Sequence, residues 1–97
     1  MTKSTYLDLI TETVRRNGLD PELLIAMVPA ESNLNANAES RSGATGLMQL
    51  MPALAEQYDV FDPLNPAQNL DVESRYFKDL LTRFNGNTVL TLAAYNP

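Results

Sequence analysis

Residues 31–49 of the chain read ESNLNANAESRSGATGLMQ, which joins an acidic residue at the end of an apolar segment to a loop rich in turn-forming residues. Counting back from Glu31, apolar residues recur at spacings of three, four, seven and eight, at Val28, Met27, Leu24 and Leu23. On a helix these residues share one face with the acid. The stretch therefore predicts a helix whose core-facing stripe ends in a carboxyl group.

The position of Glu31 favours a role as a proton donor. Burial of a carboxyl group against apolar side chains disfavours the charged form and raises the pKa. A general acid that works near neutral pH needs this shift. The structural alternative is that Glu31 lies exposed at the helix end or caps a backbone group, which is the usual outcome for a lone acid.

Composition restricts both the size and the chemistry of the protein. With 97 residues, 44% of them hydrophobic and 20% charged, the chain is expected to form one globular domain. The net charge is −5, and the seven Lys and Arg residues are scattered, which argues against nucleic acid as a partner. Because the chain has no Cys and no His, thiol and imidazole catalysis and the usual zinc sites are excluded. We therefore expect no metal and no cofactor, and a reaction carried by carboxyl and neutral polar groups.

No apolar run approaches the roughly 18 residues of a membrane-spanning helix, so no membrane span is expected. The first residues include Asp8 and Glu12 and lack a continuous apolar stretch, so they do not form a secretory signal peptide.

Caps, prolines and apolar periodicity predict an all-α domain. An Asp or Asn followed by Pro, the usual start of a helix, occurs at residues 20–21 and 65–66. Pro29 predicts a kink just before Glu31. The predicted helices cover residues 4–17, 20–32, 46–51 (one or two turns), 52–58, 65–84 and a last helix capped by Asn87.

The last predicted helix is apolar nearly all round, at Val89, Leu90 and residues 92–95, and should be buried on every side. Either other helices enclose it, or the chain is a piece of a longer domain truncated at the C-terminus. An uncovered helix of this kind also predicts self-association into a homo-oligomer.

Four further residues are suited to a groove for an amide-bearing ligand. Met48 and Gln49 follow the glycines of the loop, and Tyr95 and Asn96 could hydrogen-bond a carboxylate or an N-acetyl group. Each has a structural alternative, namely core packing for Met48 and Tyr95, a loop-backbone contact for Gln49 and a helix end for Asn96. Taken singly, the structural alternative is favoured for each.

Together these segments resemble the catalytic domain of soluble lytic transglycosylases, which has the lysozyme-like fold of the goose-type branch. The matching segments are Glu31-Ser32, residues 42–52, Asn65-Pro66, Asn69-Leu70 and residues 93–96. The resemblance covers the chain from about residue 20 to its end. Residues 1–97 are thus expected to form a single catalytic domain, with an N-terminal helix in residues 1–19 and the family-matching core in residues 20–97.

The resemblance implies cleavage of the β-1,4 bond between N-acetylmuramic acid and N-acetylglucosamine in peptidoglycan, with formation of a 1,6-anhydro ring. Glu31 would be the single acid and base of this reaction, and Ser32 and Tyr95 would orient or polarise it. Met48, Gln49 and Asn96 would line the sugar groove, whereas Leu70, Tyr76 and Phe77 would be structural. The implied location is the cell envelope, periplasmic or extracellular.

Two alternative functions remain beside the lytic reaction, and the presence of a second carboxyl group at the site bears on them. Glycosidases with two carboxyl groups hold them roughly 5 to 9.5 Å apart. Candidates for a second carboxyl are Glu39, Asp59 and Asp62, all in predicted loops, so a single buried acid is expected. The alternatives are a goose-type lysozyme, which hydrolyses the same bond with water, and a truncated fragment that binds glycan or self-associates without catalysis.

Three residues depart from the pattern of the resembled family. Pro29 stands where members of the family usually have a polar or aliphatic helix residue, Leu54 replaces a common Thr, and Glu73 replaces a common Gly in the long helix.

Overall fold

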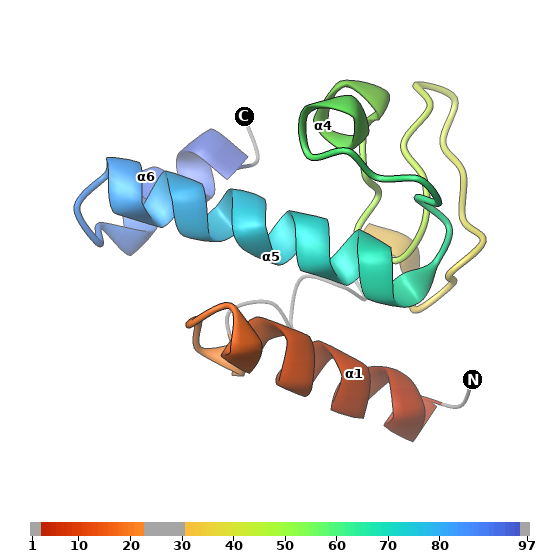
Figure 1. Cartoon of the computed structure of the whole chain (residues 1–97), viewed down its shortest axis with the longest axis horizontal. Helices are drawn as coiled ribbons and strands as arrows, with labels where there is room; N and C mark the ends of the chain where they lie inside the picture. Colours follow the sequence, from red (N-terminus) through yellow and green to blue (C-terminus); the bar gives the residue numbers. More distant parts are fainter. Residues whose placement is uncertain (1–2, 23–30, 96–97) are drawn as a thin grey trace.

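A computed structural model of the chain describes residues 3–22 and 31–95 (Figure 1). This part of the chain contains the helices α1 (Lys3–Arg16), α4 (Pro52–Gln57), α5 (Pro66–Arg83) and α6 (Thr88–Tyr95). Residues 21–22 and 31–32 are also helical, and between residues 31 and 95 the only β-type pairing consists of isolated bridges. The predicted all-α class is confirmed. No helix in the described ranges is long and apolar enough to cross a membrane.

The predicted helix starts are confirmed where the structure describes them. The Asp20 carboxylate accepts a hydrogen bond from the Glu22 N–H, and the Asn65 side chain accepts one from the Gln68 N–H. The Asn87 side chain likewise accepts from the Leu90 N–H at the start of α6. The apolar stripe predicted before Glu31 and the kink predicted at Pro29 fall in residues 23–30, outside the described residues.

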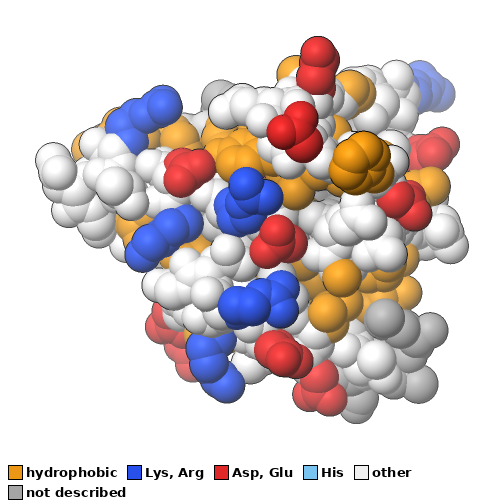
Figure 2. All heavy atoms as spheres, viewed as in Figure 1, with side chains coloured by type: hydrophobic (Ala, Val, Ile, Leu, Met, Phe, Trp, Pro, Cys, Tyr) orange, Lys and Arg blue, Asp and Glu red, His pale blue; other side chains and the backbone are white. Residues whose placement is uncertain are grey.

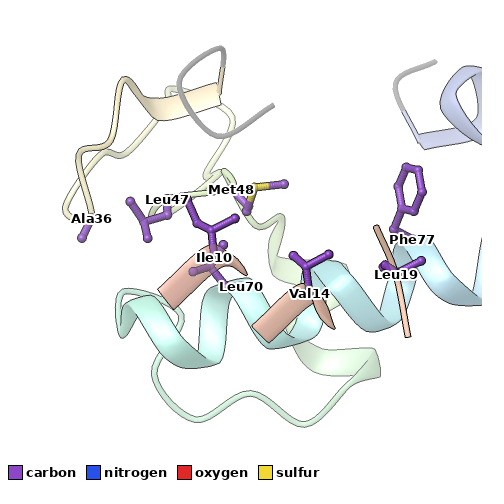
Figure 3. Packing of buried hydrophobic residues seen from close by; sticks show 8 residues of the cluster. All are labelled: Ile10, Val14, Leu19, Ala36, Leu47, Met48, Leu70 and Phe77. Carbon is purple, nitrogen blue, oxygen red and sulfur yellow. The ribbon is translucent and has the colours of Figure 1, made fainter. Parts of the chain in front are cut away.

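Helix α5 is the centre of the domain, because both α1 and α6 pack against it (Figure 1). Ile10 and Val14 of α1 meet Leu70 and Phe77 of α5 in a core that Figure 3 shows from close by. Leu47 and Met48, from the loop before α4, complete this core, together with Leu19 and Ala36. Full burial of one such large apolar side chain stabilises the fold by about 1.5 to 3 kcal/mol.

The prediction of helical turns at residues 46–51 is wrong. Thr45 and Leu50 exchange two backbone hydrogen bonds, of 2.9 and 2.8 Å, and form an antiparallel bridge. The chain between them makes a tight turn in which Gly46 has φ +79° and Gln49 has φ +54°. Because a right-handed helix needs negative φ, these two residues exclude it, and the apolar side chains are buried from a turn instead.

Asn69 joins α5 to this turn through two hydrogen bonds and to the loop before α5 through a third. Its carbonyl oxygen accepts from the Met48 N–H at 2.8 Å, and its amide group donates to the carbonyl oxygens of Thr45 and Pro63 at 2.8 and 2.7 Å. The side chain is fully buried, so these bonds replace those that water would make. The position of residues 45–48 is therefore fixed relative to α5.

One side of α6 is exposed. The exposed fractions of the Val89, Leu90 and Leu92 side chains are 76%, 50% and 38%, whereas Thr91 is buried. The described residues thus do not enclose this helix on every side, and self-association through its exposed face stays a prediction.

This self-association predicts a mass that rises with concentration in light scattering. Replacement of Val89 and Leu92 together by Glu places charges on the exposed face and should keep the chain monomeric. A control, Ala67→Glu, adds a charge at an exposed position of α5 and should leave association unchanged. A parent chain that stays monomeric at every concentration would contradict the prediction.

Gly46→Ala should destabilise the fold far more than Gly86→Ala. Both glycines have φ near +80°, so both substitutions carry the cost of left-handed backbone, about 1 to 2 kcal/mol. A Cβ at Gly46 would lie 2.4 Å from the Asn69 amide nitrogen, whereas a Cβ at Gly86 meets nothing within 4 Å. Urea unfolding should show a loss of roughly 3 kcal/mol or more for Gly46→Ala. Equal losses for the two variants would mean that the Asn69 contact does not constrain the turn.

Candidate active site

A cavity of about 340 Å³ lies where the loop of residues 33–51, α5 and α6 meet the helical residues 31–32. It brings together residues that are up to 64 positions apart in the chain. The lining residues are Glu31, Ser40, Ala44, Met48, Gln49, Met51, Glu73, Tyr76 and Tyr95.

Four of the six residues predicted for the site line this cavity, namely Glu31, Met48, Gln49 and Tyr95. Ser32 follows Glu31 in the chain and is half-buried, but it is not among the lining residues. Asn96 lies outside the described residues.

Glu31 is half-buried at the cavity, and burial raises its pKa above the ordinary value for a glutamate. The direction of this shift is the one expected from the sequence. A carboxyl group that keeps its proton more readily than usual is suited to proton donation.

Met48 and Gln49 have structural contacts as well as a place at the cavity. Met48 is buried in the core, and its backbone N–H donates a hydrogen bond to the side-chain oxygen of Asn69. The side-chain nitrogen of Gln49 donates to the backbone oxygens of Gly46 and Ala38, at 3.0 and 3.3 Å. These bonds fix the Gln49 side chain through its nitrogen, while the same residue lines the cavity.

Tyr95 makes a different contact from the one predicted. Its hydroxyl group donates a hydrogen bond of 2.5 Å to Oε2 of Glu73, so the hydrogen expected to polarise Glu31 goes to a different acid. The Tyr95 ring packs against the rings of Tyr76 and Phe77, with centroid distances of 5.7 and 5.5 Å. These contacts fix the end of α6 against α5 and set Tyr95 beside the cavity.

Glu73 is the unexpected member of the site. It lines the cavity from α5, yet only 4% of its surface is exposed. Burial raises the pKa of Glu73 to about 7, the hydrogen bond from Tyr95 partly opposes this shift, and the negative charge of Glu31 adds to it. Burial and the nearby Glu73 charge also hold the pKa of Tyr95 far above its usual value, so its hydroxyl stays a donor.

The expectation of a single buried acid at the site is therefore wrong, because Glu73 is a second one, whereas the role of Glu31 as the single acid and base stays a prediction. Glu39, Asp59 and Asp62, the candidates named from the sequence, are exposed and do not line the cavity. Glu73 does so because it stands three residues after Leu70 and four before Phe77, on the buried face of α5. The same spacing argument that identified Glu31 could have identified it. Tyr76, predicted to be structural, also lines the cavity.

The cavity contains no positive charge to balance its two acids. None of the described residues that line it is Lys or Arg, and residues 1–2, 23–30 and 96–97 contain no charged side chain in the sequence. Elsewhere, acidic and basic side chains are interspersed on the face that Figure 2 shows. Within residues 3–22 and 31–95, no group of three or more His, Cys, Asp or Glu side chains could hold a metal ion.

Comparison with known proteins gives one consistent group of relatives. The Transglycosylase SLT domain matches residues 8–97. Over 84 residues the chain is 40% identical to membrane-bound lytic murein transglycosylase F of Alteromonas mediterranea, a match that covers 80% of this chain and 18% of that protein. It is 38% identical over 78 residues to a transglycosylase of Enterobacteria phage PRD1, a match covering 80% of this chain and 29% of the phage protein.

Solved structures give the same group. An inactive mutant of the lytic transglycosylase Slt from Pseudomonas aeruginosa superposes with a TM-score of 0.78 at 30% identity, over 92% of this chain and 16% of the other. The 70 kDa soluble lytic transglycosylase of Escherichia coli gives a TM-score of 0.77 at 25% identity, with the same coverage. The chain therefore spans less than a third of the length of each of these proteins.

The raised pKa of Glu73 predicts a pH-dependent stability that Glu73→Gln removes. The unfolded chain loses this proton near the ordinary value of 4.5 and the folded chain near 7. Between these values the folded state binds more protons, so the free energy of unfolding falls with rising pH, by about 3 kcal/mol in total, and is level above.

In urea unfolding, Glu73→Gln should match the parent near pH 4 and be more stable near pH 8. The control Glu56→Gln, at an exposed position of α4, should follow the parent at both pH values. A parent whose stability advantage over Glu73→Gln grows with pH would contradict the assignment.

Proposed function

The chain belongs to the Transglycosylase SLT domain family, and from this membership we propose that it cleaves the glycan strands of peptidoglycan as a lytic transglycosylase. The bond cleaved is the β-1,4 bond between N-acetylmuramic acid and N-acetylglucosamine, and the site of action is the cell envelope. The observation that carries the proposal is Glu31, a half-buried carboxyl group with a raised pKa at the cavity that the predicted groove residues also line.

In the proposed reaction Glu31 acts first as an acid and then as a base. Its proton moves to the glycosidic oxygen as the bond from this oxygen to C1 of N-acetylmuramic acid breaks. The 6-hydroxyl oxygen of the same sugar then bonds to C1, and its proton passes to the Glu31 carboxylate. The products are a 1,6-anhydro end and a free 4-hydroxyl group, and Glu31 is protonated again, now with the proton of the 6-hydroxyl group. No water is consumed.

The other cavity residues are proposed to bind the glycan. Met48, Tyr76 and Tyr95 offer apolar and aromatic surface for sugar rings, and Gln49 offers its side-chain oxygen to a hydroxyl or acetamido N–H donor. Ser32 as a residue that orients Glu31 and Asn96 as a glycan ligand stay predictions.

Hydrolysis is the second candidate, because Glu73 supplies a second carboxyl group at the cavity. In that reaction a water oxygen would bond to C1 and its proton would pass to a Glu73 carboxylate. Glu73 is poorly suited to this step, since it is almost fully buried and holds its own proton up to about pH 7. The lytic reaction needs no second base and is therefore favoured.

Digestion of purified peptidoglycan by the parent chain and by Glu31→Gln tests the proposal. Because a positioned general acid contributes on the order of a hundredfold or more to rate, the variant should lose at least that factor. Glu39→Gln, which alters an exposed acid of the loop, is the matched control and should retain the parent's rate.

Mass spectrometry of the products separates the candidates. Anhydro ends from the parent, and none from Glu31→Gln, are the expected result. Reducing ends would instead assign hydrolysis. A folded parent chain that releases no products would reject catalysis by this chain and leave the non-catalytic alternative.

A further inference from the structure

Glu73 has no part in the reaction proposed above, yet it lines the same cavity as Glu31. One of its oxygens, Oε2, accepts the Tyr95 hydroxyl hydrogen at 2.5 Å. Among the residues that the structure describes, Tyr95 is the only hydrogen-bond partner of the Glu73 side chain. The other oxygen, Oε1, has no partner among these residues, and since Glu73 lines the cavity, a molecule bound there can serve as its partner.

The surroundings of Glu73 favour its neutral form. The titratable groups that face it at the cavity are Glu31, Tyr95 and Tyr76, and none of them carries a positive charge. A carboxylate here would be buried without a cation and would repel ionised Glu31. The raised pKa of Glu73, about 7, agrees with this arrangement.

A neutral carboxylic acid differs from a carboxylate in what it can bind. A carboxylate only accepts hydrogen bonds, whereas the acid has one hydroxyl donor and one carbonyl acceptor. With Oε2 occupied as the acceptor for Tyr95, the proton resides on Oε1 and can be donated. A buried acid kept neutral so that it donates a hydrogen bond is a known use of such sites.

We propose that Glu73 is a ligand-binding residue that acts as a neutral acid, accepting the Tyr95 hydroxyl at Oε2 and donating its own proton from Oε1 to an acetamido oxygen of the bound glycan. The acetamido oxygen is chosen because an amide carbonyl is the best neutral acceptor that an N-acetylated glycan offers. The identity of the ligand rests on the proposed function, whereas the neutral state of Glu73 does not.

The neutral state is tested by carbon NMR of the carboxyl groups from about pH 4 to about pH 10, which needs no activity and no ligand. The Glu73 signal, assigned by its absence in Glu73→Gln, should titrate near 7. Tyr95→Phe should move this midpoint to higher pH, because it removes a hydrogen bond that favours the charged form. A Glu73 midpoint near the ordinary glutamate value would overturn the inference and leave the proposed function untouched.

The donor role is tested by calorimetric binding of chitotetraose, an oligomer of N-acetylglucosamine, to Glu31→Gln, which removes both turnover and the Glu31 titration. Affinity should fall about tenfold as pH rises through the Glu73 midpoint measured in the same variant. Adding Glu73→Gln should abolish this fall, because the amide donates at every pH. Adding Glu73→Leu should lower the affinity about tenfold at every pH, with circular dichroism verifying the fold.

The two proposals fail separately. Affinity that does not depend on pH in Glu31→Gln, equal affinity of the chains that carry Glu73→Gln and Glu73→Leu, or no binding of chitotetraose would each overturn the donor role of Glu73. None of these results bears on Glu31, because the anhydro products of peptidoglycan digestion decide the reaction independently.

Discussion

The three hydrogen bonds of Asn69 are the constraint on which the site depends. Two of them, to Thr45 and Met48, attach the turn at residues 45–48 to α5, and the third holds the backbone of Pro63, so Met48 and Gln49 are presented from a fixed backbone. An amide side chain is needed here because it accepts one hydrogen bond and donates two, a combination that neither a carboxylate nor a hydroxyl group provides. The burial of Asn69 makes each of these bonds costly to lose, since water cannot replace them.

The same helix carries the second half of the site. Glu73 lies one turn after Asn69 on α5, and Tyr76 follows it, so Asn69, which holds the loop, shares one helix with two of the residues that line the cavity. The hydrogen bond from Tyr95 to Glu73 then attaches α6. A single helix thus sets the relative positions of the loop, of the Glu73 carboxyl group and of the aromatic residues Tyr76 and Tyr95. Glu31 belongs to a separate part of the chain.

Local signals in the sequence predicted most of the architecture, because capping and proline geometry act over a few residues. Asp20, Asn65 and Asn87 form the predicted caps, and Pro52 and Pro66 begin helices as expected. The secondary structure of residues 46–51 is ambiguous in the sequence, because a turn and a short helix can both bury the same apolar side chains. Left-handed backbone at Gln49, which is not a glycine, has no local signal of its own.

The candidate site was predicted in part for the same reason. Glu31, Met48, Gln49 and Tyr95 meet at one cavity, but the partner of Tyr95 depends on how α6 packs against α5, which short-range patterns do not encode. The sequence signal for Glu73 is its place between Leu70 and Phe77 on the buried face of α5, where an acid replaces a common Gly.

The most direct test of the proposed site is a crystal structure of Glu31→Gln with a bound peptidoglycan glycan. The scissile glycosidic oxygen should lie within hydrogen-bond distance of the residue 31 side chain, and the glycan should contact Gln49, Tyr95 and Glu73. A glycan bound elsewhere, or a scissile bond beyond the reach of residue 31, would contradict the proposed site.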